Sequence, residues 1–292
     1  MLNNKPEVTN NIESGDESTN IQTRDNAQIH QTINQGLSYS DVRTMIMDVF
    51  KANFYDLGEN AAEVAKARAE ELVNDFLSKL QQHPETILEN TKDPDLRYAI
   101  FEAQEGFARR GEKETADMLV DILIKRTLAS EKPLLKLVLD EAIKVIPKLT
   151  VRQMDILSLI FAIRYINYSA PVPPFANYYN FVLRPFVHDF GIPISNAFYQ
   201  HLQYAGCISI SIGSSKFLPN IKGKFGDIQS VPEPIFIERL YAFPGIENIH
   251  KGWDQTSVCH STLTSVGIAI AYSNLQRLLG QFDADLSIWI NE

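Results

Sequence analysis

The residues of this chain that could act as a nucleophile and its base do not form a recognisable catalytic pattern. Cys259 and His260 are neighbours in the sequence. Adjacent residues on a strand point to opposite faces, so this pair is poorly placed for proton transfer. The second cysteine, Cys207, starts a β-like apolar run in which a small core residue is expected. No Gly-x-Ser-x-Gly segment occurs, and we therefore predict no catalytic residues.

Metal and cofactor patterns are equally poorly represented. The six histidines give no His-x-x-x-His spacing, and no Cys-x-x-Cys is present. Neither glycine-rich nucleotide loop occurs, and Gly223–Gly226 is interpreted as a turn. Acidic pairs such as Glu70-Glu71 are explained as solvated helix faces. The sequence predicts no metal and no cofactor, and it favours a non-enzymatic protein without excluding an enzyme.

One aromatic cluster could form a ligand site around a proline-rich segment. We expect it to pack two domains together, and the alternative is a ligand groove at their junction, which would make the protein a ligand binder or an enzyme. The candidate junction residues are Tyr165, Tyr168, Tyr178, Tyr179 and Phe186.

Composition limits the setting and the partners. The chain has 292 residues, a formal net charge of −9 and two cysteines. The charge argues against a general polyanion binder, and the scarcity of cysteine fits a reducing compartment. No run approaches the roughly 20 apolar residues that a membrane-spanning helix needs, and the N-terminus does not resemble a signal peptide. We expect a cytoplasmic protein with no membrane partner.

The sequence predicts a mainly α-helical protein, whose helices must position the candidate side chains named above. Residues 1–37 are expected to form a polar, largely disordered leader, because they cannot bury enough apolar surface to offset their ordering entropy. The alternative is that Ile21, Ile29 and Ile33 form short β segments that pair between copies.

Residues 38–168 predict a bundle of about six helices, since apolar residues recur at helical spacing throughout. Asp93 and Thr150 are placed as N-caps, and Gly111 as a stop. A proline-rich linker, residues 169–175, is the predicted boundary of this domain.

Residues 176–292 predict a smaller α+β domain with a winged-helix-like arrangement. A helix capped by Ser195 stops at Gly206, and the alternation over Cys207–Gly213 indicates a strand. In Leu263-Thr264-Ser265-Val266-Gly267, Thr264 is expected to cap a helix and Gly267 to permit close packing. Residues Leu286–Ile290 predict a final short strand. An unrelated small α+β domain is the alternative.

A winged helix raises the question of DNA. Gln200 lies on the predicted recognition helix, and Lys216, Lys222 and Lys224 fall in a predicted loop after the strand, where a wing could contact phosphate. The helix itself carries no Lys or Arg. We therefore favour a protein-binding platform over nucleic acid.

The chain resembles a family of bacterial proteins of unknown function. The resemblance is carried by Gly15-Asp16-x-Ser18-x-Asn20-Ile21-Gln22, by Gly36–Arg43, by Asp48–Phe54 and by Leu263–Gly267. Similar polar leaders precede several bacterial anti-phage and conflict proteins, so the resemblance implies a defence setting. It brings no catalytic residues with it.

The leading hypothesis is a non-enzymatic bacterial interaction or regulatory protein, an accessory in phage defence or abortive infection. Its expected partner is a protein or further copies of itself. The first alternative is a DNA-binding regulator that uses the C-terminal domain. The second is an enzyme or ligand binder at the aromatic junction.

Overall fold

The structure is a computed structural model that describes residues 39–291 except 54–58, 83–92, 130, 169–173, 188–190, 226–227, 229, 281 and 283. Residues 37–292 form one compact unit. The predicted class is confirmed: the unit is mainly helical with one small two-stranded sheet. The predicted leader, residues 1–37, lies outside the described residues. No helix in the described ranges is both long and apolar enough to cross a membrane.

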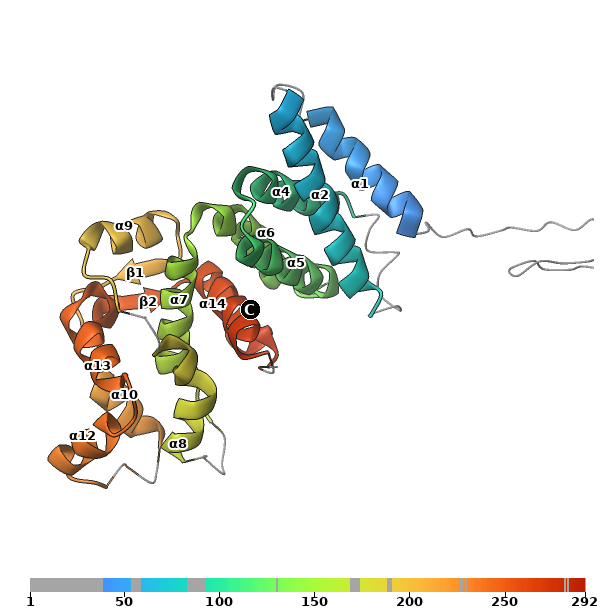
Figure 1. The fold of residues 1–292 in the computed structure, drawn as a ribbon. Helices are drawn as coiled ribbons and strands as arrows, with labels where there is room; N and C mark the ends of the chain where they lie inside the picture. Colours follow the sequence, from blue (N-terminus) through green and yellow to red (C-terminus); the bar gives the residue numbers. More distant parts are fainter. Residues whose placement is uncertain are drawn as a thin grey trace, which may run out of the picture. The chain divides into compact units, whose positions relative to one another are not determined.

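The first half of the unit is a series of helices that pack against one another (Figure 1). Asp93 accepts a hydrogen bond from the N–H of Asp95 at 3.0 Å, and Gly111 ends its helix with φ 72°. Thr150 and Gln153 form a reciprocal capping box. These caps are the ones that the sequence predicted. The elements are α1 (Tyr39–Asn53), α2 (Glu59–Leu80), α4 (Pro94–Arg110), α5 (Lys113–Leu128), α6 (Pro133–Val145), η1 (Ile146–Lys148) and α7 (Val151–Arg164).

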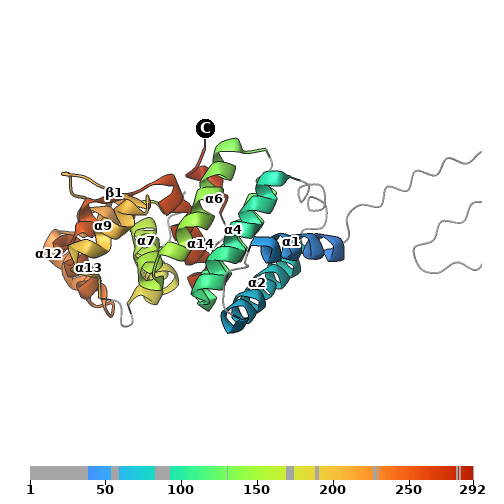
Figure 2. The same ribbon diagram turned by 90° about the horizontal axis from the view of Figure 1, so that it is seen from above.

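The second half contains shorter elements around the sheet. The long helix α14 (Ser265–Leu279) packs along α7, and Figure 2 shows the two side by side near the middle of the unit. The other elements are α8 (Phe175–Tyr178), η2 (Tyr179–Leu183), η3 (Arg184–Phe186), α9 (Asn196–Tyr204), β1 (Ile208–Ile210), α10 (Phe217–Lys224), α12 (Glu233–Tyr241), α13 (Ile246–Gln255), η4 (Ser257–His260), β2 (Ser261–Leu263) and η5 (Leu286–Ile288).

One apolar core runs through both predicted domains. Buried residues of α7 and α14 belong to the same cluster as those of α4 and α5. Most of the predicted linker, residues 169–173, lies outside the described residues. The domain boundary at residues 169–175 therefore stays a prediction.

The sheet joins two segments that are far apart in the sequence. β1 pairs antiparallel with β2, with Ile208 opposite Leu263 and Ile210 opposite Ser261. A Cβ on Gly267 would lie 1.9 Å from the carbonyl oxygen of Cys207, so the predicted close packing at this glycine is confirmed. Three helices, α10, α12 and α13, lie between the two strands in the sequence, and the winged-helix-like arrangement stays a prediction.

Three local predictions are corrected. Leu286–Ile290 is not a strand: Asp285 caps the short helix η5, which buries Leu286 and Ile290 and leaves Ile288 exposed. A single helical turn also places residues four apart on one face, so alternation over five residues could not distinguish the two structures.

The other two corrections concern the stretch after β1. Lys222 and Lys224 lie within α10, and Lys216 is its N-cap residue, so they do not occupy a wing loop. The predicted turn at Gly223–Gly226 begins inside the same helix, although Gly226 is outside the described residues. A glycine within a helix is tolerated at a modest cost, which is why the pattern misled.

Candidate functional site at α9 and β1

The predicted aromatic junction holds the fold together. Tyr178 is buried, and its hydroxyl donates to the carbonyl of Ala162 on α7 at 2.7 Å. The Tyr179 hydroxyl donates to the carbonyl of Pro244 at 2.9 Å. Phe186 is buried as well. These contacts tie the segment after the predicted linker to α7 and to the stretch before α13.

The two remaining junction residues have different neighbours. Tyr168 is half-buried, and its ring lies 6.1 Å from that of Tyr178 and 6.2 Å from that of Phe225. The Tyr165 hydroxyl reaches β2, where it accepts a hydrogen bond from the N–H of Leu263 at 2.9 Å. The structure thus brings Tyr168 and Tyr178 together and places Tyr165 at the sheet.

The three predicted phosphate contacts make intramolecular interactions. Nζ of Lys216 donates to the main-chain oxygen of Asp254 at 3.0 Å. Nζ of Lys224 donates to the carbonyl of Ile166, and burial lowers the pKa of this lysine to about 8. Lys222 lies over an aromatic ring on α12, with Nζ 5.8 Å from the ring centre. Gln200, by contrast, is exposed on α9.

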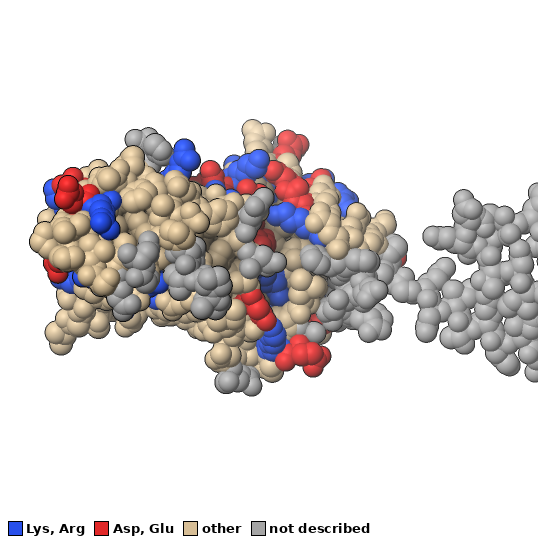
Figure 3. All heavy atoms as spheres, turned by 90° about the horizontal axis from the view of Figure 1, so that it is seen from below, with Lys and Arg blue, Asp and Glu red and all other residues tan. Residues whose placement is uncertain are grey.

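One face of the molecule carries charges of both signs. On the face that Figure 3 shows, acidic and basic side chains are interspersed, and neither sign forms a continuous patch. Together with the net charge of −9, this face offers little to a polyanion.

Helix α9 is anchored on its inner side only. Tyr199 and Leu202 are fully buried beneath it. From α7, Gln153 Nε2 donates to the carbonyl of Phe198 at 3.3 Å and lies 2.9 Å from Nδ1 of His201. The residue that closes the capping box of α7 therefore also positions α9, and the outer face of α9 is left to solvent.

Large apolar side chains stand exposed on the segment that contains α9 and β1. Ile194 is 86% exposed, Tyr204 90% and Ile212 103%. These are the highest values for large apolar side chains within the described part of the chain. Single exposed apolar residues are ordinary, whereas several on one short segment are typical of an interaction surface.

The two strands differ in how their outer edges are treated. In an antiparallel pair, residues alternate between those that exchange main-chain hydrogen bonds and those that do not. Ser211 N–H donates to His260 at 3.0 Å and Thr264 N–H to Cys207 at 3.0 Å, so the odd-numbered residues of this segment face β2. The N–H and C=O of Ile210 consequently point away from β2.

The outer edge of β2 is closed by side chains of α7. A guanidinium nitrogen of Arg164 donates to the carbonyl of Ser261, and the Tyr165 hydroxyl bonds Leu263. For the outward groups of Ile210, no partner exists among the described residues. Ile210 is half-buried and the residues on either side of it are exposed. The outer edge of β1 at Ile210 is therefore unpaired.

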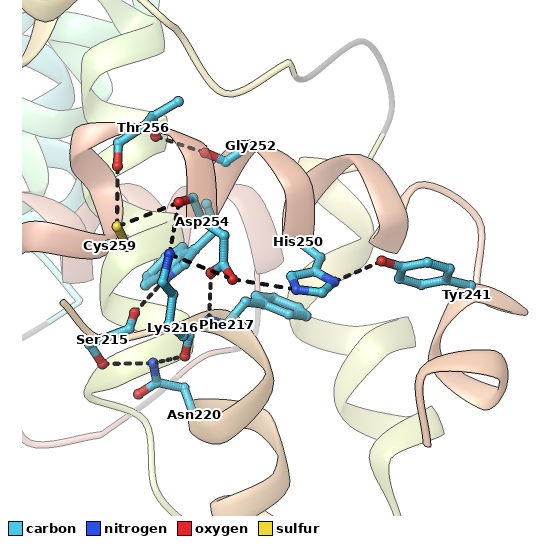
Figure 4. A network of polar contacts seen from close by, with 11 residues as sticks. Ser215, Lys216, Phe217, Asn220, Tyr241, His250, Gly252, Asp254, Thr256 and Cys259 are labelled. Carbon is cyan, nitrogen blue, oxygen red and sulfur yellow. Dashed lines mark hydrogen bonds and ion pairs between the residues drawn. The ribbon is translucent and has the colours of Figure 1, made fainter. Parts of the chain in front are cut away.

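The loop after β1, which carries Ile212, is fastened to α13 and η4 by a polar network (Figure 4). Ser215 N–H donates to the carbonyl of Cys259 at 2.7 Å, and the Trp253 indole N–H donates to the carbonyl of Ser215 at 2.7 Å. The carboxylate of Asp254 accepts from the N–H of Phe217 at 2.9 Å, at the start of α10.

The same network lines up a phenol, an imidazole and a carboxylate. The Tyr241 hydroxyl lies 2.8 Å from Nδ1 of His250, and Nε2 of His250 lies 3.6 Å from Asp254 Oδ2. The neighbouring thiol of Cys259 donates to the carbonyl of Thr256 at 3.3 Å, and burial raises its pKa. A thiol held in that state is a poor nucleophile, so the network serves to hold α10 against α13.

Sequence reasoning missed this surface apart from Gln200. Ile212 falls in the predicted strand, and the helical spacing gave no role to Ile194 and an inward position to Tyr204, because periodicity does not report which faces stay uncovered. The one available signal was that the helix Asn196–Tyr204 carries neutral polar residues on its outer face and no Lys or Arg. We name Ile194, Gln200, Tyr204, Ile212 and the edge of β1 at Ile210 the α9–β1 surface.

Comparison with known proteins gives a family and no activity. No curated protein and no solved structure matches the chain. A family model matches residues 36–231 and 229–290, which include the helical body and Leu263–Gly267 but not the leader motif at residues 15–22. The family is an uncharacterised one, as the resemblance predicted. Because the two matched ranges span most of the described unit, the chain belongs to this uncharacterised family.

Proposed function

We propose that this chain is a non-enzymatic interaction protein that binds a partner protein through the α9–β1 surface. The bound part of the partner is an extended segment that adds to the outer edge of β1. The observation that carries the proposal is the unpaired N–H and C=O of Ile210 on the same short segment, residues 194–212, that exposes Ile194, Tyr204 and Ile212.

Strand addition suits this chemistry. An extended peptide supplies the donor and acceptor that an unpaired edge lacks, and its alternate side chains reach pockets or apolar anchors beside that edge. Tyr204 and Ile212 would be those anchors. Because the outer face of α9 carries no formal charge, the partner segment is expected to be apolar and weakly charged.

The DNA-binding alternative receives no support from a specific contact. Its lysines bond within the chain, and its one helix residue, Gln200, is uncharged. Its test remains the affinity for mixed DNA at low salt, where phosphate contacts are strongest.

The proposal is tested by site-specific photo-crosslinking of the full chain in its native host. A benzophenone amino acid replaces Tyr204 on the α9–β1 surface, and in a matched control it replaces Tyr98, an exposed tyrosine of α4. We expect one defined adduct from position 204 and none from position 98.

A second substitution tests the strand edge itself. Ile210→Pro removes the outward N–H without removing a bond between β1 and β2, since that N–H does not face β2. The adduct at position 204 should disappear with Ile210→Pro and persist with Ile210→Val. If the proline does not affect the adduct, the partner does not bind by strand addition. If the adduct contains two copies of this chain, the chain binds itself and not a partner protein.

Two finer parts of the proposal rest on sequence. α9, β1, β2 and α14 follow the order of a winged-helix-like platform, and the polar leader suggests a role in phage defence. Deletion of the gene should then raise the plaque count of at least one phage, and the Tyr204→Ser variant should fail to restore protection. Equal plaque counts with and without the gene across a phage panel would remove the defence role.

A further inference from the structure

A second feature of the unit is a polar hollow between α2, α5 and α14. Its volume is about 390 Å³, within the range of small-molecule sites, about 300–1,000 Å³. We name it the polar pocket. The residues that line it are Lys79, Asp117, Asp121, Ser273, Gln276 and Arg277.

Two buried polar atoms of α14 border this pocket without a hydrogen-bond partner. Ser273 is 1% exposed, and within the described structure its hydroxyl oxygen is unpaired. The amide nitrogen of Gln276 donates to the Tyr272 hydroxyl at 3.1 Å and to the carbonyl of Phe282 at 2.8 Å. Both bonds fix the orientation of the amide, which leaves Oε1 as its unpaired atom.

On the side of α14 that faces α7, the buried polar groups are hydrogen-bonded. Ser158 of α7 donates to the carbonyl of Ala271 at 3.0 Å. The Asn274 amide donates to Asp155 and to Ser158, each at 2.9 Å, and Arg277 Nε donates to the Asn274 oxygen at 3.0 Å. Unpaired buried polar atoms are uncommon in folded proteins, so the two on the pocket side point to a missing partner.

The charges of the pocket are separated. Lys79 and Asp117 both line it, yet neither forms an ion pair among the residues described. Asp121 is paired with Lys125, and Arg277 lies 3.7 Å from Asp155. The pocket therefore presents an uncompensated cation and an uncompensated anion together with one hydroxyl and one amide oxygen.

We propose that the polar pocket binds a small zwitterion of the α-amino-acid type. Its carboxylate lies toward Lys79 and Arg277 and accepts a hydrogen bond from the Ser273 hydroxyl. Its ammonium group lies toward Asp117 and donates to Oε1 of Gln276. A molecule with both charges pairs with Lys79 and with Asp117 and satisfies both unpaired atoms, whereas a simple anion or cation leaves one charge of the pocket without a partner.

Calorimetric titration of the full chain with each proteinogenic L-amino acid tests this site. We expect at least one amino acid to bind. Ser273→Ala should weaken it about tenfold through loss of a charge-assisted hydrogen bond. The matched control is Ser209→Ala, the same exchange at an exposed serine of β1 that does not line the pocket, which should leave the affinity within about twofold.

Charge-selective variants separate the two halves of the ligand. The best-binding amino acid is compared with two analogues, an amine that lacks the carboxylate and an acid that lacks the amino group. Asp117→Asn should lower the affinity for the amine and leave the affinity for the acid unchanged. Lys79→Gln should lower the affinity for the acid and leave the affinity for the amine unchanged. Absence of binding by every L-amino acid would overturn the proposal, as would equal affinities in the wild type, Ser273→Ala and Asp117→Asn proteins, because the unpaired atoms would then be satisfied by water alone.

Discussion

The two strands of the sheet are equally short, three residues each, and have opposite surroundings. The outer edge of β2 is bonded by Arg164 and Tyr165, and it lies against α7 in the core. The outer edge of β1 at Ile210 has no such partner in the described part of the chain, and the side chains beside it are exposed. Nothing within either strand decides this difference. A strand becomes core or interaction surface according to the element that packs against its edge.

The largest expected effect comes from forcing the sheet away from α14. Gly267→Ala places a Cβ against the carbonyl of Cys207, a main-chain atom that cannot move aside. We expect a loss of about 3 kcal/mol in the free energy of unfolding, at the upper end for overpacking. Urea denaturation measures it. Gly223→Ala in α10, where the new Cβ meets nothing within 4 Å, is the control and should not destabilise the protein.

Loss of the Ser158 hydroxyl from the contact between α7 and α14 should also lower the free energy of unfolding. Ser158→Ala leaves the buried amide of Asn274 without one acceptor, which should cost about 2 kcal/mol of unfolding free energy. Ser273→Ala removes a hydroxyl that has no hydrogen-bond partner among the described residues, so stability should change by less than about 0.5 kcal/mol. Equal losses in the two variants, measured by thermal unfolding, would contradict the distinction between paired and unpaired sides of α14.

At the edge of β2, Tyr165→Phe removes the group that bonds the N–H of Leu263. The expected loss in unfolding free energy is about 1 kcal/mol, since the ring stays and only the hydrogen bond goes. Hydrogen exchange is the sharper measurement: the Leu263 amide should exchange faster in the variant. An unchanged rate would mean that α7 does not close this edge.

Lys224, which bonds the carbonyl of Ile166 just after α7, should make the stability of the protein depend on pH. Burial lowers its pKa in the folded protein to about 8, below the ordinary lysine value of 10.5. The unfolded chain therefore binds more protons between these values, and stability should rise as pH rises from about 8 to 10.5. Lys224→Met should flatten that rise, whose slope from one lysine cannot exceed about 1.4 kcal/mol per pH unit. Identical pH profiles of the two proteins would show that Lys224 is solvated.

The smallest effect on stability is expected for a substitution on the α9–β1 surface. Tyr204→Ser replaces a side chain that is 90% exposed, so its unfolding free energy should stay within about 0.5 kcal/mol of the wild type. If the melting temperature falls clearly, Tyr204 packs within the protein and the α9–β1 surface loses one of its anchors.

The sequence predicted those features that depend on a side chain and the main chain a few residues away. The caps at Asp93 and Thr150, the stop at Gly111 and the close approach at Gly267 were all predicted, because each depends on a few neighbouring residues or on the absence of a Cβ. The strand at residues 286–290 and the lysine loop were wrong, because short apolar patterns fit a strand and a helical turn alike.

The candidate surface and the polar pocket lay beyond such reasoning. Ile194, Tyr204 and Ile212 resemble core residues by type, and Ser273 resembles a residue on the polar face of a helix. Which of them is covered depends on contacts between segments far apart in the chain, such as Gln153 with α9 or Tyr165 with β2.

The sequence by itself determined a mainly helical protein, the helix caps at Asp93 and Thr150, the stop at Gly111 and the glycine on which the sheet contact depends, but it gave no sign of α10, α12 and α13. The predicted features follow from side-chain periodicity and from backbone preferences that act over a few residues. The tertiary structure alone decided that the edge of β2 is closed by Arg164 and Tyr165 and that the edge of β1 at Ile210 is open. Burial and unpaired hydrogen-bonding groups are properties of how distant segments meet, and no local pattern encodes them.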